Sequence, residues 1–309
     1  MRLIFMGTPH AAVPTLRRCL EDGHDVVAVW TQPDKPVGRS SKPAPSPVKE
    51  FALEQGIAVH QPQKIRAQEA IDLFTSHGAD AAIVVAYGRI LPSSFLQAPR
   101  RGCINVHFSL LPLYRGAAPV NWAIVRGEHQ TGVSTMLIEE ELDSGPVLLQ
   151  RTTAIGEREI APELMSRLSL TGAELLSETL AQLDDLKPQP QNEDKATFAP
   201  LLRKEDGLID WSLTSEQIER HVRGFQPWPN AYTHHNSQRL IIWKAETIAH
   251  DAMQHRDGEV LKASGGELIL ACGQDTYLRL VEIQPEGKKR MVVRDFLNGT
   301  RIRAGDQFG

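Results

Sequence analysis

Residues 2–30 of the chain read RLIFMGTPHAAVPTLRRCLEDGHDVVAVW and contain two apolar runs on either side of a helical pattern. The runs, residues 2–6 and 26–30, are typical of buried strands. Between them, apolar residues recur with helical spacing at Val13, Leu16 and Leu20. A strand, a helix and a second strand in this order favour a doubly wound, Rossmann-like α/β sheet. Gly7 lacks the following glycines of a dinucleotide fingerprint, so we do not expect an NAD site.

Similar patterns continue along the chain and divide it into two parts. Further helices are predicted over residues 47–55, 67–77, 120–125 and 161–186, and further strands over 57–60, 81–86, 133–138 and 147–152. Residues 189–206 have the polar composition of a linker, so residues 1–188 are expected to form the first domain. Short strands are predicted at 231–234, 240–245, 258–263, 267–271 and 277–283. They suggest a smaller, OB-like β-barrel domain over residues 207–309.

The composition is that of a soluble globular protein. The 309 residues are 41% hydrophobic and 23% charged, and no apolar run is long enough to span a membrane. The first residues enter a strand at once and are not typical of a signal peptide. The three cysteines are too widely spaced for a metal motif or a disulfide framework, so we expect a cytoplasmic protein without a metal site. The net charge of −4 argues only mildly against a nucleic-acid partner.

Residues 102–119 carry the first candidate site. The run Cys103-Ile104-Asn105-Val106-His107 is typical of a strand, and alternation places Asn105 and His107 on one face of it. Ligands bind at the carboxyl ends of parallel strands, although two polar side chains there could equally hold a neighbouring loop. The following Ser109-Leu110-Leu111-Pro112 is predicted to be a loop with two exposed leucines, suited to a flat apolar ligand. The segment 87–92, after another buried strand, could bind such a ring through its backbone or serve only as a connection.

The pattern Asn-x-His-x-Ser-Leu-Leu-Pro, followed by Leu142-Asp143-Ser144-Gly145, resembles the folate-dependent formyltransferase family. The resemblance covers nearly the whole chain. It implies that Asn105, His107 and Asp143 are the catalytic residues, that 10-formyltetrahydrofolate is the formyl donor, and that no metal is required. It also implies that the loop Ser109, Leu110, Leu111 and Pro112 lines the tetrahydrofolate site. Phe108 departs from the family, where a small residue is usual, and could crowd the folate or turn away.

Two basic segments of the chain indicate which molecule would accept the formyl group. Residues 31–49 hold five prolines and a charge balance of +3, which is typical of a solvated loop or of a phosphate-binding one. The segment resembles the inserted loop of family members that act on initiator methionyl-tRNA, which implies tRNA contacts for Arg39 and Lys42. Residues 288–303 carry six basic side chains and one acidic side chain. Among them, Lys288, Lys289 and Arg290 are predicted to contact tRNA phosphates. The alternative is that they form only a solvated surface.

These observations leave three readings. The first is an enzyme that formylates initiator methionyl-tRNA, with folate and tRNA as its only implied partners. The second is a formyltransferase for another amine, such as a nucleotide sugar or glycinamide ribonucleotide, because the central motif does not distinguish acceptors. The third is a catalytically inactive tRNA-binding protein, which the presence of Asn105, His107 and Asp143 argues against. A nucleophilic mechanism through Cys103 is disfavoured, because no partner base accompanies it in the sequence.

Overall fold

The computed structural model describes residues 1–36, 43–249 and 255–309, and these form two compact units. Unit 1 consists of Met1–Pro119, Gln130–Ala154 and Met165–Ala199. Unit 2 consists of Val120–His129, Ile155–Leu164 and Pro200–Gly309. Each unit has its own hydrophobic core. Within the described ranges, no helix combines the length and the hydropathy needed to cross a bilayer.

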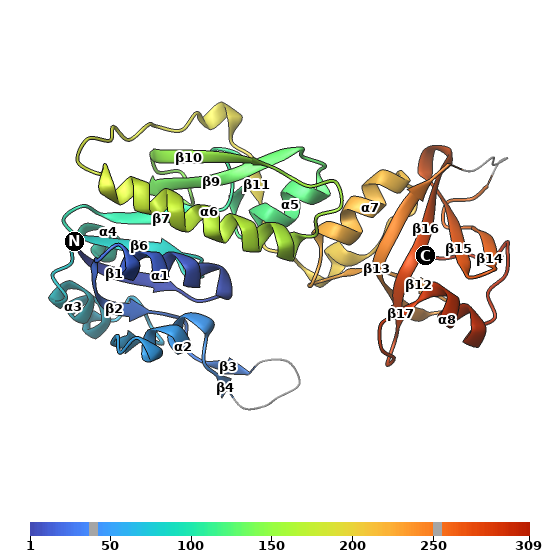
Figure 1. Ribbon diagram of the computed structural model, residues 1–309, viewed down its shortest axis with the longest axis horizontal. Helices are drawn as coiled ribbons and strands as arrows, with labels where there is room; N and C mark the ends of the chain where they lie inside the picture. The colour runs from blue at the N-terminus through green and yellow to red at the C-terminus, as the bar shows by residue number, and fades with distance from the viewer. Residues whose placement is uncertain (37–42, 250–254) are drawn as a thin grey trace. The chain divides into compact units, whose positions relative to one another are not determined.

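Unit 1 is built on a seven-stranded sheet with the order β10-β9-β7-β6-β1-β2-β5 (Figure 1). The strands are β1 (Arg2–Gly7), β2 (Asp25–Trp30), β5 (Val59–His60), β6 (Ala81–Val85), β7 (Cys103–His107), β9 (Gln130–Leu137) and β10 (Val147–Ala154). The five strands from β7 to β5 are parallel, and β9 and β10 extend the sheet in antiparallel pairing. The strand order reverses between β1 and β6, so the predicted doubly wound arrangement is confirmed.

Helices cover both faces of this sheet. They are α1 (Val13–Glu21), α2 (Pro47–Glu54), α3 (Gln68–Ser76), α4 (Ser93–Gln97) and, from Met165 on, α6 (Ala161–Ala181), whereas α5 (Pro119–Val125) belongs to unit 2 from Val120 on. On one face, Trp30, Phe74 and Phe95 pack together with Cys103 in a single apolar cluster. On the other face, α6 approaches the sheet so closely that a Cβ on Gly172 would lie 2.8 Å from Val106. Helix α6 ends at Ala181, five residues before the predicted end at 186.

The segment treated above as a linker is partly regular structure. Its first residues pair with β10 through Val147 and Gln189, and β11 (Phe198–Ala199) pairs with β8 (Arg115–Gly116) in parallel. Residues up to Ala199 therefore belong to unit 1 by their contacts. The cause is tertiary pairing, which a polar composition does not reveal.

The base of the 31–49 loop is held by several contacts. Strands β3 (Lys35–Pro36) and β4 (Pro43–Ala44) pair with each other, and the Thr31 and Ser46 hydroxyls are 2.8 Å apart. Ser46 caps α2 as predicted, because its Oγ accepts from the Lys49 amide. The Lys49 ammonium binds Asp34 at 2.6 Å, and hydrogen bonds from Gln61 and Lys49 lower the pKa of Asp34. Lys49 is therefore already paired and adds little to the positive charge of this loop.

Unit 2 is a smaller antiparallel structure with the strand order β12-β13-β16-β15-β14, and β17 pairs with β16. The strands are β12 (Ala231–His235), β13 (Gln238–Ile248), β14 (Val260–Ser264), β15 (Glu267–Cys272), β16 (Thr276–Pro285) and β17 (Met291–Val292), and the helices are α7 (Ser215–Gly224) and α8 (Val293–Gly299). The predicted fold class, a doubly wound sheet followed by a smaller antiparallel β unit, is confirmed. Among the described residues the hydrogen-bonded path runs from β12 to β14 without closing, which is compatible with the partly open barrels of OB-like domains.

A partly buried histidine, whose ring Nε2 is out of contact with solvent, makes the stability of unit 2 depend on pH. Burial lowers the pKa of His221, on α7, to about 4, because the charged imidazolium would lose its hydration there. The unfolded chain binds a proton at this residue below about pH 6.5, whereas the folded chain resists it until about pH 4. The free energy of unfolding should therefore fall by about 3 kcal/mol between these pH values.

Urea unfolding monitored at several pH values tests this expectation. The His221→Gln variant removes the titrating group, so its curve should be flatter than that of the wild type between pH 6.5 and 4. Parallel curves for the two proteins would contradict the assignment of this pH dependence to His221.

Candidate active site

Strand β7 presents its polar side chains on one face. Asn105 and His107 share the side of the sheet on which Cys103 packs, by strand alternation. Val106 and Phe108 point the other way, toward Gly172 of α6, and Phe108 is buried. The unusual Phe108 therefore turns away from the face that carries Asn105 and His107. The sequence left two outcomes open at this position, and the structure supports the second.

His107 is fixed by a backbone carbonyl on one side of its ring. Its Nε2 lies 3.0 Å from the carbonyl oxygen of Tyr114, which can only accept, so Nε2 carries a proton. Its Nδ1 then faces Asp143, whose Oδ2 is 3.7 Å away. The His107 side chain is buried, and the Asp143 side chain is 12% exposed. The structure thus brings together His107 and Asp143, which are 36 positions apart in the sequence.

Asp143 is held by the backbone in turn. Its Oδ2 accepts a hydrogen bond of 2.8 Å from the amide of Gly116, and its own backbone adopts a left-handed conformation with φ of 51°. Gly116 must be glycine for this contact, because a Cβ there would lie 2.5 Å from the carbonyl oxygen of Ala199. The carboxylate is therefore fixed close to His107 without being in direct hydrogen-bond contact with it.

Asn105 is half-buried near the end of the same strand. In the part of the chain that the structure describes, its side-chain amide makes no hydrogen bond. A half-buried amide without a protein partner is available to a ligand, since polar groups at such depth are usually bonded. The three predicted catalytic side chains therefore combine one free donor with a His–Asp pair.

The Ser109–Pro112 loop is tied to the neighbouring strands. Ser134 of β9 donates its Oγ hydrogen to the carbonyl of Ser109 at 2.6 Å and accepts from the amide of Leu111 at 3.1 Å. Gln150 of β10 donates to Ser134 Oγ and to the carbonyl of Leu111. The peptide bond between Leu111 and Pro112 is cis. The loop is thus a fixed part of the sheet edge.

The prediction of two exposed leucines in this loop is wrong. Leu111 is 5% exposed, and Leu110 packs so closely on β9 that a Cβ at Gly132 would lie 2.5 Å from it. The exposed apolar side chains nearby are Leu113 and Leu142. The leucines pack inward because the sheet edge supplies the apolar partner that the sequence seemed to lack. A role of the loop in folate binding stays a prediction.

The Ser134→Ala variant should lose stability, because Ser134 is fully buried and joins three polar groups. Its removal leaves buried groups without partners, at a cost of about 2 kcal/mol. The loop would also be less well held. We expect a lower midpoint of thermal unfolding and a raised KM for the formyl donor. The Ser76→Ala variant, whose exposed hydroxyl bonds only the Leu73 carbonyl on α3, is the matched control and should change neither value.

Comparisons with known proteins decide the family. The profile described as "Formyl transferase" matches residues 1–180, and that described as "Formyl transferase, C-terminal domain" matches residues 201–301. The chain belongs to the formyl transferase family. It is 47% identical to "Methionyl-tRNA formyltransferase" of Caldanaerobacter subterraneus subsp. tengcongensis, over 99% of each chain. It is 44% identical to the protein of the same name from Bacillus subtilis, over 100% of this chain and 98% of the relative.

Solved structures agree on the fold. An N-formyltransferase from Helicobacter canadensis, in complex with folinic acid and dTDP-3-aminofucose, superposes with a TM-score of 0.66 at 18% identity, over 92% of this chain and 98% of the other. "Methionyl-tRNA formyltransferase from Clostridium thermocellum" superposes with a TM-score of 0.55 at 16% identity, over 80% and 93%. At these identities the likeness concerns the fold alone.

A cavity adjoins the Asp143 loop in this formyl transferase. It measures about 480 Å³ and lies between α4 and the acidic loop, and its lining includes Ser93, Leu96, Ile138 and Ser144. The hydroxyl of Ser93 donates to the carboxylate of Glu140 at 2.5 Å and joins the two walls. The loop 87–92 is held at its start, since the Tyr87 carbonyl accepts from Thr8 and Gln32.

Cys103 is not an available nucleophile. It is buried beside α4, and burial raises the pKa of its thiol to about 12. The thiol donates weakly to the carbonyl of Phe95 at 3.5 Å. A thiolate is therefore not present near neutral pH. Across the described ranges, no three His, Cys, Asp or Glu side chains are grouped to hold a metal ion.

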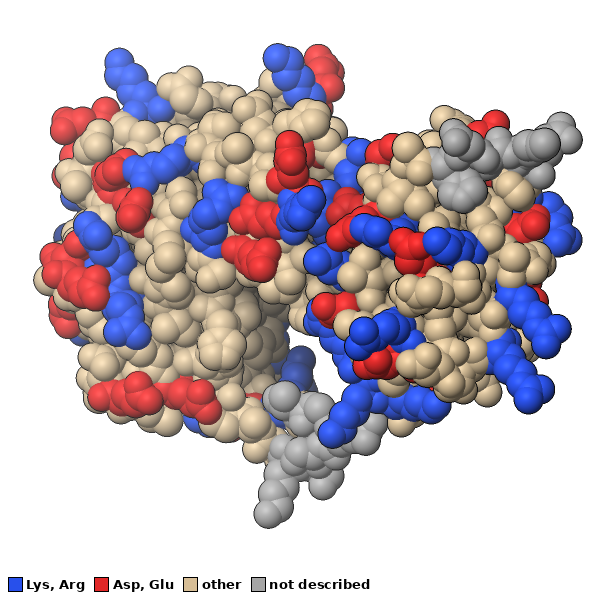
Figure 2. Space-filling model, turned by 45° about the vertical axis from the view of Figure 1, so that its right-hand side comes forward, with Lys and Arg blue, Asp and Glu red and all other residues tan. Residues whose placement is uncertain are grey.

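The predicted tRNA-binding residues are only partly visible. Arg39 and Lys42 lie outside the described residues. Lys288 and Lys289 are exposed in unit 2, and Arg290 pairs with Glu282 and lies over the ring of Trp243 at 5.0 Å. Figure 2 shows Lys and Arg side chains gathering along the lower and outer edges of this unit. Of the three predicted tRNA-binding residues that the structure describes, Lys288 and Lys289 are thus free to contact a ligand.

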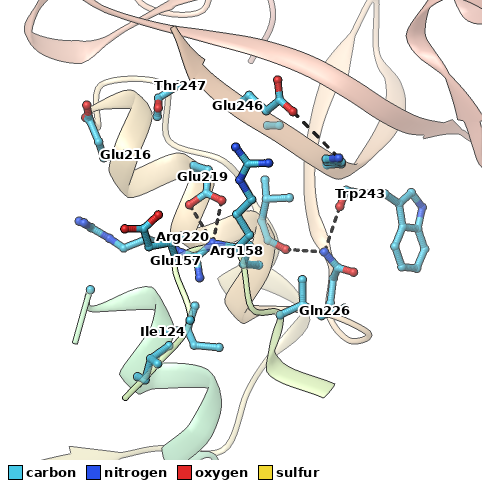
Figure 3. A pocket seen from close by; sticks show the side chains of 18 of the residues that line it. Ile124, Glu157, Arg158, Glu216, Glu219, Arg220, Gln226, Trp243, Glu246 and Thr247 are labelled. Atoms are coloured by element: carbon cyan, nitrogen blue, oxygen red, sulfur yellow. Dashed lines mark hydrogen bonds and ion pairs between the residues drawn. The ribbon is translucent and has the colours of Figure 1, made fainter. Parts of the chain in front are cut away.

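Unit 2 also contains a pocket of about 570 Å³ (Figure 3). Its charged lining includes the five basic residues Arg158, Arg220, Arg223, Lys244 and Arg290 and the five acidic residues Glu128, Glu157, Glu216, Glu219 and Glu246. Glu219 binds Arg223 within the pocket, and the charges balance. The pocket therefore gives no preference for a polyanion such as RNA.

Sequence reasoning missed several residues of the site. Tyr114 and Gly116 act through their backbone, and Gln191 contacts the backbone of Asp143 from the segment treated as a linker. The Arg115-Gly116 pair within the central motif was the only signal for any of them. Gln191 gave none, because a glutamine in a polar segment looks like solvated surface.

Proposed function

We propose that this formyl transferase moves a formyl group from 10-formyltetrahydrofolate to the amino group of initiator methionyl-tRNA. The observation that carries the proposal is the similarity to methionyl-tRNA formyltransferases at 44–47% identity along both units of the chain. The His107–Asp143 pair and the free Asn105 amide support an active enzyme over an inactive binding protein. Charged tRNA occurs in the cytoplasm, which agrees with the three buried, unpaired cysteines.

The reaction is an acyl transfer. The amino nitrogen of the methionyl group attacks the formyl carbon, and the carbonyl oxygen becomes an oxyanion. The bond between the formyl carbon and N10 of the folate then breaks. From its ammonium form the acceptor nitrogen loses two protons in all; one is transferred to the leaving N10 and the other is released to solvent. The products are N-formylmethionyl-tRNA and tetrahydrofolate, so the enzyme must stabilise an oxyanion and move protons.

The His107–Asp143 pair suits the proton transfer. Nε2 of His107 is occupied by the Tyr114 carbonyl, so Nδ1 is the nitrogen that acts. Nδ1 and Oδ2 of Asp143 are both acceptors when His107 is neutral, and they lie 3.7 Å apart. A substrate N–H placed between them would satisfy both. This arrangement supports Asp143 and His107 as joint proton acceptors for the attacking amine.

Asn105 suits the oxyanion. Its neutral amide donates without needing a protonation step, and no protein group among those described competes for it. Asn105 lies on the same face of β7 as His107, so both can address one carbonyl. When His107 is protonated by the amine, its ring adds a positive charge beside the oxyanion.

The folate and the tRNA are assigned to separate surfaces. The cavity beside Ser93 and Ser144 is large enough for a flat ring, and the Ser109–Pro112 loop, which Ser134 holds in place, is proposed as a second contact of the folate. The paired base of the 31–49 loop supports its use as a projecting tRNA contact, with Arg39 and Lys42 as the proposed residues. Lys288, Lys289 and Arg290 are proposed as sequence-independent phosphate contacts.

The acceptor is tested by comparing kcat/KM for initiator methionyl-tRNA, a nucleotide-linked amino sugar and glycinamide ribonucleotide, each with 10-formyltetrahydrofolate. The proposal expects tRNA to exceed the small amines by several orders of magnitude. It also expects Arg39→Ala to raise KM for tRNA while leaving KM for folate unchanged. Preference for a small amine would overturn the tRNA assignment, and no transfer to any amine would favour an inactive binding protein.

A further inference from the structure

Gln191 uses its whole side-chain amide to join two parts of the active site. Its Nε2 donates to the carbonyl of Asp143 at 2.8 Å and to the carbonyl of Gly145 at 2.7 Å. Its Oε1 accepts from Nε and Nη2 of Arg115 at 3.0 and 2.8 Å. Both hydrogens and both lone pairs are thus occupied, and rotating the amide by 180° would break all four bonds.

Arg115 stands at the centre of the segment that holds the catalytic pair. The residue before it, Tyr114, offers its carbonyl to His107, and the residue after it, Gly116, donates its amide to Asp143. The Arg115 side chain is 2% exposed and is paired with the carboxylate of Glu193. Its hydrogen bonds to Glu193 raise the pKa of Arg115 further, so it remains a fixed cation.

The backbone of the Asp143 loop needs such support. Asp143 adopts a left-handed conformation, which is unfavourable for residues other than glycine. Gly145 is pressed against β9, where a Cβ would lie 1.9 Å from the carbonyl of Leu137. Two hydrogen bonds from one amide hold the carbonyls on either side of Ser144. They fix the turn that aims the Asp143 carboxylate.

We propose that Gln191 is a positioning residue for the catalytic pair, and this inference rests on the proposed function. Gln191 connects the main chain of Asp143 to the side chain of Arg115 by hydrogen bonds. These bonds keep the Asp143 carboxylate and the His107 ring at the distance from each other at which both can contact the proton that is transferred. It touches neither reacting group and acts only through geometry. Small displacements of a catalytic group are costly, and loss of about 1 Å of positioning lowers rates by about 100-fold.

The Gln191→Glu variant tests this with a change of one atom. The carboxylate keeps an acceptor for Arg115, and that contact gains charge complementarity. It loses both N–H donors and places an oxygen against the carbonyls of Asp143 and Gly145. The loop should then shift while the fold is retained. The matched control is Gln189→Glu, the same substitution two residues earlier, where the exposed amide bonds only the carbonyl of Lys187.

The expected result is a fall in kcat of about 10- to 100-fold for Gln191→Glu, with both KM values within threefold of wild type. The thermal midpoint should fall only modestly, because two carbonyls lose their donors while the contact with Arg115 is kept. Gln189→Glu should match the wild type. A wild-type kcat in Gln191→Glu would overturn the inference. A parallel fall in thermal midpoint and rise in KM would overturn it as well, since that pattern marks a merely structural role.

A second readout does not require formyl transfer. The ¹⁵N chemical shifts of the His107 ring report its hydrogen bonding and its neighbour, and they should change in Gln191→Glu but not in Gln189→Glu. Unchanged shifts in Gln191→Glu would overturn the inference even if activity falls. If the wild type proves inactive toward methionyl-tRNA, the proposed function fails, while these shifts still decide the role of Gln191.

Discussion

Replacing Asp143 by Asn should lower kcat for formyl transfer about 1,000-fold, within the range of general-base effects. The amide has the same shape as the carboxylate, and its oxygen can still accept the hydrogen bond from Gly116. It cannot accept a proton. The Asp143→Asn variant therefore removes proton transfer and keeps the local structure, and His107 then faces a neutral amide instead of a carboxylate.

The measurement is a single-turnover rate with saturating 10-formyltetrahydrofolate and charged initiator methionyl-tRNA. The thermal midpoint of Asp143→Asn should stay close to that of the wild type. Asp185→Asn is the matched control, because Asp185 is an exposed carboxylate of unit 1 just after α6. A rate within tenfold of wild type in Asp143→Asn would contradict the role of the carboxylate in proton transfer.

Replacing Asn105 by Asp should lower kcat by about 100- to 1,000-fold, as expected when one oxyanion donor is lost. The two side chains have nearly the same volume, so packing on β7 is retained. A carboxylate offers no N–H to the oxyanion and adds a negative charge beside it. Since the oxyanion exists only in the transition state, KM for the formyl donor should change little.

Asn105→Ser provides a second test of oxyanion stabilisation by residue 105. The serine hydroxyl is still a donor, although on a shorter side chain, so kcat should be higher than in Asn105→Asp and lower than in the wild type. The Asn121→Asp variant is a control that probes a structural amide, since Asn121 donates to the Gly224 carbonyl within unit 2. It should change stability more than kcat. An Asn105→Asp enzyme with raised KM and normal kcat would indicate a binding role instead.

Local patterns in the sequence predicted most of the fold. The apolar runs at residues 2–6 and 26–30 became β1 and β2, and the spacing of Val13, Leu16 and Leu20 became α1. Such features depend on neighbours a few positions away, which a sequence displays directly. The structure of residues 189–199 depends on pairing with distant segments, which a polar composition does not reveal, and the apolar pattern also overran the end of α6.

In the candidate site, too, some residues were predictable from the sequence and others were not. The three side chains proposed to carry the chemistry are Asn105, His107 and Asp143, and they were predicted because their residue types and order resemble a known family. Contacts made by backbone groups, such as the Tyr114 carbonyl and the Gly116 amide, carry no residue-specific signal. The direction of Leu111 could not be foreseen either, because it follows from the hydrogen bonds that hold the loop to Ser134.

The most direct test of the central claim is to identify the product. Wild-type protein is incubated with formyl-labelled 10-formyltetrahydrofolate and charged initiator methionyl-tRNA, the aminoacyl ester is hydrolysed, and the released amino acid is analysed by mass spectrometry. The account predicts labelled N-formylmethionine from the wild type and almost none from Asp143→Asn or Asn105→Asp. Unmodified methionine from the wild type, or equal label in all three proteins, would contradict it.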